Sequence, residues 1–265
     1  MTSTNKGTAV VTGASTGIGA VYADRLAKRG YDLILVARNI DRLNTLAERL
    51  TKETGVKVTT IGADLNDKKA LGELEKILKE YKDINMLVNN AGIGSVASIL
   101  DADVDEMEAM IDLNITALTR LTYAIAPVFA AKGSGTIINI ASVVGIAIEL
   151  LNGVYSASKS YVLSFGHSLQ KDLADKGVRI QTVLPGGTAT EFWDVAGYAK
   201  VKEAPTTMSA EDLVDAALAG LDNGELVTIP PLQDNQDWEQ WETARRALTP
   251  KFANAKPGSR YGLAS

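Results

Sequence analysis

The regular alternation of short apolar runs with amphipathic stretches constrains the fold of this chain more than any other sequence feature. The run at residues 32–37 is almost continuously apolar, as in a parallel strand that is covered on both faces. The predicted strands are residues 8–12, 32–37, 56–61, 85–88, 135–141, 178–184 and 226–229, and the predicted helices lie at about 18–29, 43–50, 67–81, 104–132, 153–176, 209–221 and 234–248. This alternation predicts an α/β fold with a parallel, doubly wound sheet between layers of helices.

Length and composition are typical of one soluble domain. The chain has 265 residues, 46% of them hydrophobic, so we expect residues 1–265 to form a single domain. A net charge of −5 without a basic stripe argues against nucleic acid and membranes as partners. No apolar run reaches about 18 residues and no leader pattern follows the first residues, so we expect a cytoplasmic protein.

Two residue types limit the possible chemistry. The chain contains no cysteine, which excludes disulfides, thiolate metal sites and cysteine nucleophiles. Its single histidine, His167, is too few for a histidine metal cluster, and no nucleophile elbow of a hydrolase accompanies it. We therefore expect no metal site and assign His167 to helix packing.

A glycine-rich turn follows the first predicted strand, with the spacing Thr12-Gly13-x-x-x-Gly17-x-Gly19. Backbone amides at a helix N-terminus bind phosphate, and glycines let the backbone approach a dinucleotide closely. The same glycines would also serve a tight strand-to-helix turn for purely steric reasons. The position after the first strand of an α/β chain favours a dinucleotide site.

Tyr155 and Lys159 lie four residues apart at the start of a predicted helix. Positions i and i+4 share one helix face, which places the phenol beside the ammonium group. A nearby cation favours the phenolate, so we expect a Tyr155 pKa lowered from about 10 towards neutrality. Such a tyrosine can exchange a proton with a substrate oxygen. The spacing alone also occurs in helices by chance.

Four motifs together resemble those of the short-chain dehydrogenase/reductase family. They are the glycine turn, Asn89-Asn90-Ala91-Gly92 after the fourth strand, Ser142, and Tyr155-x-x-x-Lys159, and the resemblance covers about residues 6–190. It implies a single Rossmann-type sheet of about seven strands that binds a nicotinamide cofactor.

The resemblance also implies catalytic roles. Ser142 would hydrogen-bond the substrate carbonyl oxygen, Tyr155 would protonate it, and Lys159 would bind the nicotinamide ribose and lower the tyrosine pKa. Asn114 would orient a water that links Lys159 to solvent.

Further positions are assigned to the cofactor. They are Gly13, Ser15, Thr16, Gly17, Ile18, Gly19, Arg38, Asn39, Asp64, Leu65, Asn90, Ala91, Gly92, Tyr155, Lys159, Pro185, Gly186, Thr188 and Thr190. Some have a local alternative, such as the helix N-cap that Asp64 could form. Thr188 departs from the family pattern, in which this position is usually aliphatic.

The end of the second strand indicates which cofactor is preferred. An NAD-selective site places a carboxylate there for the adenosine ribose hydroxyls, and that carboxylate would repel a 2′-phosphate. Here the position is Ala37, and Arg38, with Asn39 and Arg42 nearby, offers donors to a phosphate. We therefore expect NADP(H) to be preferred over NAD(H). A solvated arginine at a helix start is the alternative.

Apolar side chains cluster in the stretches expected to surround the substrate. The candidates are Ser95, Val143, Val144, Phe192 and Trp193, together with Ile93, Gly94, Ile148 and Leu151. They predict a pocket for an apolar or aromatic carbonyl compound, but core packing would need the same residues. A loop at about 187–208 would cover the site, and a C-terminal helix and tail would span about 234–265. Trp238 and Trp241 favour packing or a subunit interface over substrate contact.

These observations predict an enzyme that transfers a hydride between NADPH and a carbonyl compound or secondary alcohol. The small-molecule substrate would be an apolar or aromatic ketone or aldehyde, and the resemblance implies a homodimer or homotetramer. The alternative is a catalytically idle NADP(H)-binding regulatory module, which should lack one or more of the four catalytic residues. None is missing from this sequence.

Overall fold

The structure is a computed structural model that describes residues 6–263. The chain forms two compact units, divided between Pro230 and Pro231. The expectation of a single domain over 1–265 stays a prediction, and its first five and last two residues lie outside the described range.

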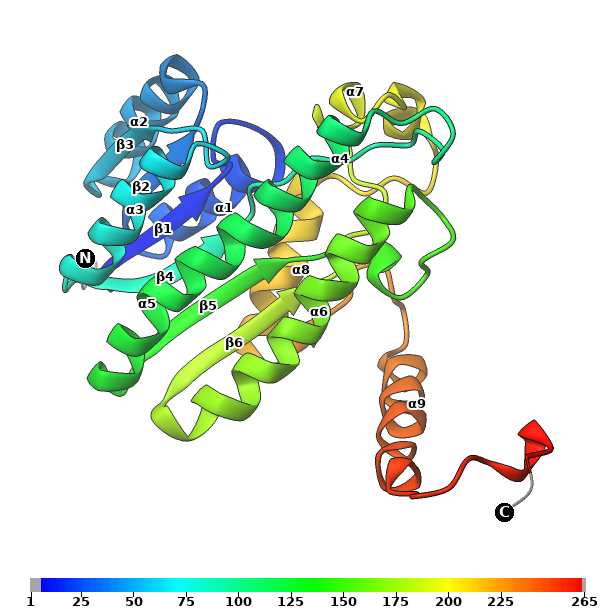
Figure 1. Ribbon diagram of the computed structural model, residues 1–265. Coiled ribbons are helices and arrows are strands. Elements are labelled where there is room, and N and C mark those ends of the chain that lie inside the picture. The colour runs from blue at the N-terminus through cyan, green and yellow to red at the C-terminus, as the bar shows by residue number, and fades with distance from the viewer. Residues whose placement is uncertain (1–5, 264–265) are drawn as a thin grey trace. The chain divides into compact units, whose positions relative to one another are not determined.

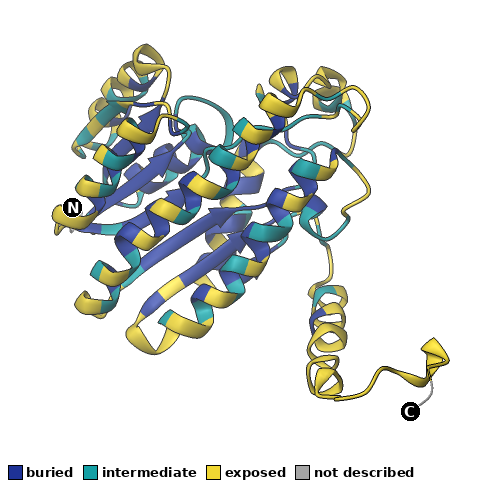
Figure 2. Ribbon diagram, in the orientation of Figure 1, coloured by how far each residue is buried: buried dark blue, intermediate teal, exposed yellow. Residues whose placement is uncertain are grey.

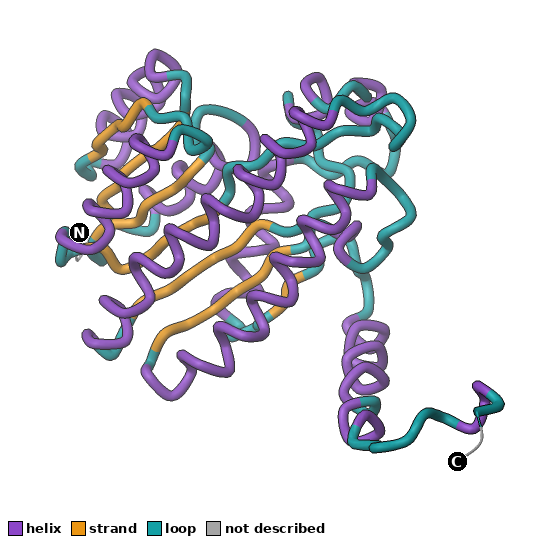
Figure 3. The backbone as a smooth tube through the Cα atoms, in the orientation of Figure 1, coloured by secondary structure: helices purple, strands orange, loops and turns teal. Residues whose placement is uncertain are grey.

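Strands and helices alternate throughout the first unit (Figures 1 and 3). The strands are β1 (Thr8–Thr12), β2 (Asp32–Ala37), β3 (Val58–Gly62), β4 (Ile84–Asn89), β5 (Gly135–Ile140), β6 (Val178–Val183) and β7 (Val227–Thr228). The α-helices are α1 (Gly17–Lys28), α2 (Ile40–Thr54), α3 (Lys68–Glu80), α4 (Val104–Ile111), α5 (Leu118–Lys132), α6 (Gly153–Leu173), α7 (Phe192–Val195) and α8 (Ala210–Asp222). Short 3₁₀ turns occur at Val143–Gly145, Ala174–Lys176 and Ala199–Glu203.

Within residues 6–263, seven parallel strands form a sheet in the order β3-β2-β1-β4-β5-β6-β7. The order reverses between β1 and β4, and in a doubly wound sheet this switch leaves a crevice at the carboxyl ends of the strands. Thr12 at the end of β1 pairs with Val36 of β2, and Val11 pairs with Val88 of β4. The loops after β1 and β4 therefore leave the sheet at one edge. The predicted doubly wound α/β fold is confirmed.

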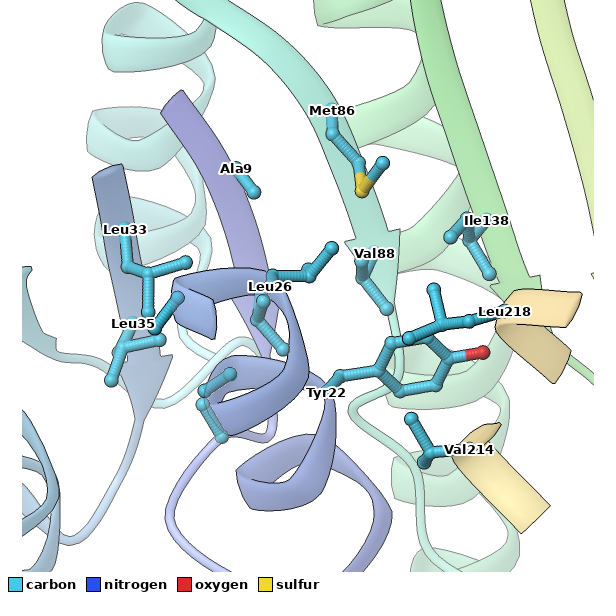
Figure 4. Close-up of a cluster of buried hydrophobic side chains, with 14 of the residues drawn as sticks. Ala9, Tyr22, Leu26, Leu33, Leu35, Met86, Val88, Ile138, Val214 and Leu218 are labelled. Carbon is cyan, nitrogen blue, oxygen red and sulfur yellow. The ribbon is translucent and has the colours of Figure 1, made fainter. Parts of the chain in front are cut away.

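Two layers of helices cover the two faces of the sheet, and the strands between them are largely buried except for the edge strand β3 (Figure 2). One core cluster joins the strands to α1, α2 and α8, and the other joins them to α3, α5 and α6. Figure 4 shows the first cluster, in which Tyr22 of α1 lies beside Val214 and Leu218 of α8. The Tyr22 hydroxyl has no hydrogen-bond partner among the described residues, and burial raises its pKa.

The predicted 104–132 helix is interrupted in the structure. A π-helical turn, η1 (Asp112–Ala117), separates α4 from α5 and contains Asn114. Single π-helical turns inside α-helices are frequent at functional sites. By length and composition Val104–Lys132 could cross a membrane, but Leu121 and Phe129 are buried against the sheet, as in a core helix.

The second unit begins at Pro231 and contains α9 (Asn235–Arg246). Asp234 caps this helix by accepting a hydrogen bond from the N–H of Gln236. Trp238 and Trp241 stack with ring centres 4.9 Å apart. The described residues after α9 are exposed and form short 3₁₀ turns at Thr249–Phe252 and Ser259–Tyr261. The expected C-terminal helix and tail at about 234–265 stay a prediction, and the last two residues of that range lie outside the described residues.

Candidate active site

The candidate active site is a cavity of about 530 Å³ along the carboxyl ends of β1, β4, β5 and β6. Most residues that the sequence assigns to a site line it: Gly13, Ser15, Thr16, Gly17, Ile18, Arg38, Asn39, Asp64, Leu65, Asn90, Ala91, Gly92, Ser142, Val143, Val144, Tyr155, Lys159, Pro185, Gly186, Thr188, Thr190, Phe192 and Trp193. The topology therefore brings distant motifs to one place.

The glycine turn forms the floor between β1 and α1. Gly13 and Gly17 have positive φ angles of 64° and 54°, a left-handed conformation that favours glycine. A side chain at Gly19 would collide with the carbonyl oxygen of Gly13, so this residue serves close packing rather than the cavity wall. The unpaired N–H groups at the start of α1 lie at this turn, and they favour an anion such as a diphosphate.

Asn90 and Thr12 fasten the loop after β4 to the glycine turn. The Thr12 hydroxyl accepts hydrogen bonds from the N–H groups of Asn90 (3.0 Å) and Ala91 (3.1 Å). In return the Asn90 amide donates to the carbonyl oxygens of Thr12 (2.9 Å) and Gly13 (3.2 Å). These four bonds fix the relative position of the two loops where the sheet order reverses.

Ser142, Tyr155 and Lys159 form a buried polar group at the other end of the cavity. Ser142 follows β5, and its hydroxyl accepts a hydrogen bond from the N–H of Val144 at 3.3 Å. Tyr155 and Lys159 lie in the first two turns of α6. The Lys159 ammonium donates to the carbonyl oxygen of Ile140 at 3.0 Å. All three side chains lie where the apolar end of the cavity begins.

Burial decides the protonation of this group and overturns one expectation. Tyr155 and Lys159 are each 6% exposed, and desolvation penalises the charged form of both. Burial raises the Tyr155 pKa, which the hydrogen bond with Ser142 only partly offsets, and it lowers the Lys159 pKa from 10.5 to about 8. The predicted lowering of the Tyr155 pKa by Lys159 is therefore wrong for this structure. The ammonium lies 5.7 Å from the tyrosine ring centre, and desolvation of the phenol is the dominant influence on its pKa.

Asn114 lies behind the cavity wall rather than in it. Its Oδ1 accepts from the N–H of Ile93 (3.0 Å), and its Nδ2 donates to the Ile93 carbonyl oxygen (2.9 Å) and to the Ser158 hydroxyl (3.1 Å). Ser158 in turn donates to the carbonyl oxygen of Tyr155. Asn114 therefore ties the loop after β4 to α6. Its expected role in orienting a water stays a prediction.

The residues expected to contact the adenosine end are far more exposed. Asn39 caps α2 by accepting from the N–H of Arg42 at 3.0 Å, and Arg38 precedes it at the exposed start of the helix. The Arg42 guanidinium forms an ion pair with Glu191 at 2.7 Å. Arg42 and Glu191 both line the cavity. Because Arg42 belongs to α2 and Glu191 directly precedes α7, this ion pair connects the two segments.

Apolar side chains surround the Tyr155 ring. The Phe192 ring centre lies 5.7 Å from that of Tyr155 and 5.2 Å from that of Trp193. The Trp193 indole donates to the carbonyl oxygen of Thr188 at 2.9 Å, which shapes the loop before α7. Val143, Val144 and Leu151 complete this wall.

Some predicted pocket residues lie elsewhere, and some lining residues were missed. Gly94, Ser95 and Ile148 do not line the cavity: the Ser95 hydroxyl accepts a hydrogen bond from the N–H of Ala97, and Ile148 is exposed. The lining residues without a prediction are Val36, Ala63, Leu113, Ile140, Ala141, Leu150, Gly187, Glu191 and Val195. Several of these residues are next to a predicted motif in the sequence, and this adjacency is the sequence signal that could have identified them. Nothing in local sequence indicates that Glu191 meets Arg42.

The cavity fits a dinucleotide. Gly13 and Gly17 of the glycine turn line it, the start of α1 offers N–H groups, and Arg38 and Arg42 offer cations at one end. The buried serine, tyrosine and lysine lie at the other. This arrangement defines the class of dinucleotide-dependent oxidoreductases on a Rossmann-type fold.

Comparisons with known proteins specify the family. The sequence model described as short chain dehydrogenase matches residues 7–199. A short-chain dehydrogenase of Sphingobium yanoikuyae in complex with NADPH is 44% identical, with 96% of this chain and 100% of that chain covered and a TM-score of 0.93. A bulky-bulky ketone specific alcohol dehydrogenase of Comamonas testosteroni is 42% identical, with 97% and 99% covered and a TM-score of 0.90.

A curated relative is more distant. The NADP-dependent 3-hydroxy acid dehydrogenase of Schizosaccharomyces pombe is 32% identical over 231 residues, which are 84% of this chain and 89% of that protein. The chain belongs to the short-chain dehydrogenase/reductase family and is an oxidoreductase enzyme.

Proposed function

We propose that this protein is an NADPH-dependent reductase of bulky apolar or aromatic ketones and aldehydes. The observation that carries this proposal is the position of Tyr155, whose ring packs in an apolar cluster with Met107, Met110, Val144 and Phe192 at one end of the cavity. A substrate carbonyl beside the Tyr155 hydroxyl would have its substituents among the apolar side chains that line this end of the cavity, Val143, Val144, Leu151 and Phe192. The similarity to an alcohol dehydrogenase specific for bulky-bulky ketones supports the same substrate class.

The chemistry follows from the burial of the polar group. A bound nicotinamide would supply the hydride for reduction or accept it for oxidation. Ser142 and Tyr155 would hydrogen-bond the carbonyl oxygen, where negative charge develops. Because burial raises the Tyr155 pKa, the phenol stays protonated at neutral pH and suits proton donation, which is the reductive direction. Lys159, with a pKa of about 8, is mostly cationic at pH 7 and would contact the ribose.

Three observations support NADP(H) as the preferred cofactor. Position 37 at the end of β2 is alanine, so no carboxylate repels a 2′-phosphate there. Arg38 and Arg42 line the same end of the cavity. The Sphingobium structure contains NADPH, and the Schizosaccharomyces relative is NADP-dependent. We also propose a cytoplasmic location, as expected from the sequence, and a homodimer or homotetramer, as the family resemblance implies.

A substrate panel tests this function. Purified protein should oxidise NADPH in the presence of aryl ketones with two large substituents, and more slowly with acetone or short aldehydes. Loss of absorbance at the reduced-nicotinamide band measures the rate. NADPH binding without turnover of any carbonyl compound or alcohol would contradict the proposal and favour the idle regulatory module.

A further inference from the structure

Asn152 connects the helix of Tyr155 to the segment 93–97. Its Oδ1 caps α6 by accepting hydrogen bonds from the N–H groups of Val154 (2.9 Å) and Tyr155 (3.3 Å). Its Nδ2 donates to the carbonyl oxygen of Ala97 at 2.6 Å. The residue is 9% exposed and does not line the cavity. Asn152 can therefore influence the site only by positioning the start of α6 and the Ala97 backbone.

The segment 93–97 is irregular backbone that contacts both α7 and the first turn of α6. Its first residue, Ile93, lines the cavity and is fixed by Asn114. The Val96 N–H donates to the carbonyl oxygen of Ala196, directly after α7, at 3.2 Å. The segment thus joins α7, which carries apolar pocket residues, to the first turn of α6. Asn152 makes the α6 side of this connection.

We propose that Asn152 is a positioning residue that links the first turn of α6 to the segment 93–97 and so sets the width of the substrate pocket beside Tyr155. The catalytic part of this inference rests on the proposed reductase function. A plain N-cap needs only the side-chain oxygen, and serine or aspartate caps a helix about as well as asparagine. The amide nitrogen on Ala97 is the contact that capping does not explain.

Loss of the amide nitrogen should release the segment while the helix stays capped. The Ala97 carbonyl would lose its side-chain partner and would turn towards water, because an unpaired polar group inside protein is unfavourable. Gly94 of this segment lies against the ring of Phe192, so this part of the pocket wall would become less defined. The effect should appear in the binding of bulky substrates rather than in cofactor binding, because the glycine turn and its contacts with Asn90 are unchanged.

Three variants and a matched control separate the two contacts. Asn152→Ser and Asn152→Asp keep an oxygen for the cap and remove the donor to Ala97, whereas Asn152→Ala removes both. The control is Asp67→Ala, which removes the N-cap of α3, where Oδ1 accepts from the N–H of Ala70 at 2.7 Å. It should lower the melting temperature without changing KM for any ketone.

The readouts are steady-state kinetics, NADPH affinity from its fluorescence, and hydrogen exchange of backbone amides. In the Ser and Asp variants, KM for a bulky aryl ketone should rise about two- to tenfold, which corresponds to the loss of one hydrogen bond. KM for a small ketone and the NADPH Kd should stay within about twofold. Amides in the segment 93–97 should exchange faster, while those of α6 keep their wild-type rates.

Two results would overturn the inference. Wild-type kinetics and exchange in the Ser and Asp variants, with only Asn152→Ala impaired, would leave Asn152 as an N-cap alone. Faster exchange along α6 rather than in the segment 93–97 would show that the donor stabilises the helix instead. If the wild-type protein reduces no ketone, the proposed function fails, but exchange and NADPH binding still test the link because neither requires turnover.

Discussion

The two ends of the cavity arise from the same edge of the sheet but differ in exposure to water. At the end that contains Ser142, which we propose as the catalytic end, Tyr155 and Lys159 are each 6% exposed. At the adenosine end the side chains of Arg42 and Glu191 are 50% and 58% exposed, although they form an ion pair of 2.7 Å.

The difference shows that proximity of charged groups does not by itself decide their energetics. At the buried end desolvation dominates and moves the pKa values of Tyr155 and Lys159 against their charged forms. At the exposed end water and salt screen the pair, and such pairs contribute only about 0–1 kcal/mol. Substitutions should therefore have large effects at the catalytic end and smaller ones at the adenosine end.

Tyr155→Phe should have the largest effect and tests the catalytic end directly. The ring and its packing against Phe192 remain, and only the proton donor is lost. We expect kcat for ketone reduction to fall about 10²- to 10⁴-fold, the usual contribution of a general acid, with the NADPH Kd little changed. Tyr123→Phe, at a tyrosine that is 69% exposed on α5, is the control. Near-normal turnover of Tyr155→Phe would contradict the assignment.

Lys159→Met tests the cost of the buried cation through pH. The unfolded chain binds the lysine proton more tightly, because the pKa is 10.5 there and about 8 in the folded protein. The free energy of unfolding of the wild type should therefore increase as pH rises from about 8 to 10.5. Below pH 8, where Lys159 is protonated in both the folded and the unfolded state, the buried cation destabilises the folded protein fully. This difference corresponds to on the order of 3 kcal/mol.

The measurement is the free energy of unfolding from urea titrations at pH 7 and pH 10. The advantage of Lys159→Met over wild type should be larger at pH 7 than at pH 10, because methionine carries no proton to lose. Comparing the two pH values cancels the constant cost of losing the bond to the Ile140 carbonyl. A pH-independent difference would mean that Lys159 is solvated in solution. Ketone reduction should fall sharply in this variant at either pH.

Arg38→Leu, alone and with Ala37→Asp, tests the adenosine end. Charged hydrogen bonds of about 1.5–3 kcal/mol correspond to an NADPH preference of roughly 10- to 100-fold in wild type. The single variant should lose most of this preference, and the double variant should prefer NADH. The ratio of kcat/KM for the two cofactors is the measurement, with Lys52→Leu in the last turn of α2 as the control. A wild-type preference for NADH would overturn the proposed cofactor.

Glu191→Gln should have the smallest effect. Glu191 would compete with a bound 2′-phosphate for Arg42, so its neutralisation should tighten NADPH binding by up to about fivefold and leave NADH binding unchanged. High salt should remove the difference. Glu73→Gln, which breaks the exposed pair with Lys76 on α3, should not change either Kd. Weaker NADPH binding in Glu191→Gln would show instead that the pair stabilises the bound state.

The secondary structure was largely predictable because local periodicity reports burial. The apolar runs 8–12 and 32–37 correspond to β1 and β2 in full. The sequence predicts one helix over 104–132, whereas the structure has a π-helical turn at Asp112–Ala117. The apolar residues on either side of the turn keep a helical spacing, so the sequence pattern does not reveal the interruption. The four-residue helix α7 is too short for any periodicity, and the sequence predicts only a loop there.

Sequence alone determined the doubly wound fold and identified the motifs in the loops that follow the strands. The reason is that the periodicity of strands and helices and the spacing of a glycine turn are local properties of the chain. Tertiary structure decided the rest: the raised pKa of Tyr155, the Arg42–Glu191 pair and the contact of Asn152 with Ala97. Each depends on which segments pack together and how far they exclude water. The physical reason is that desolvation and contacts between distant segments have no signature in the spacing of residues along a chain.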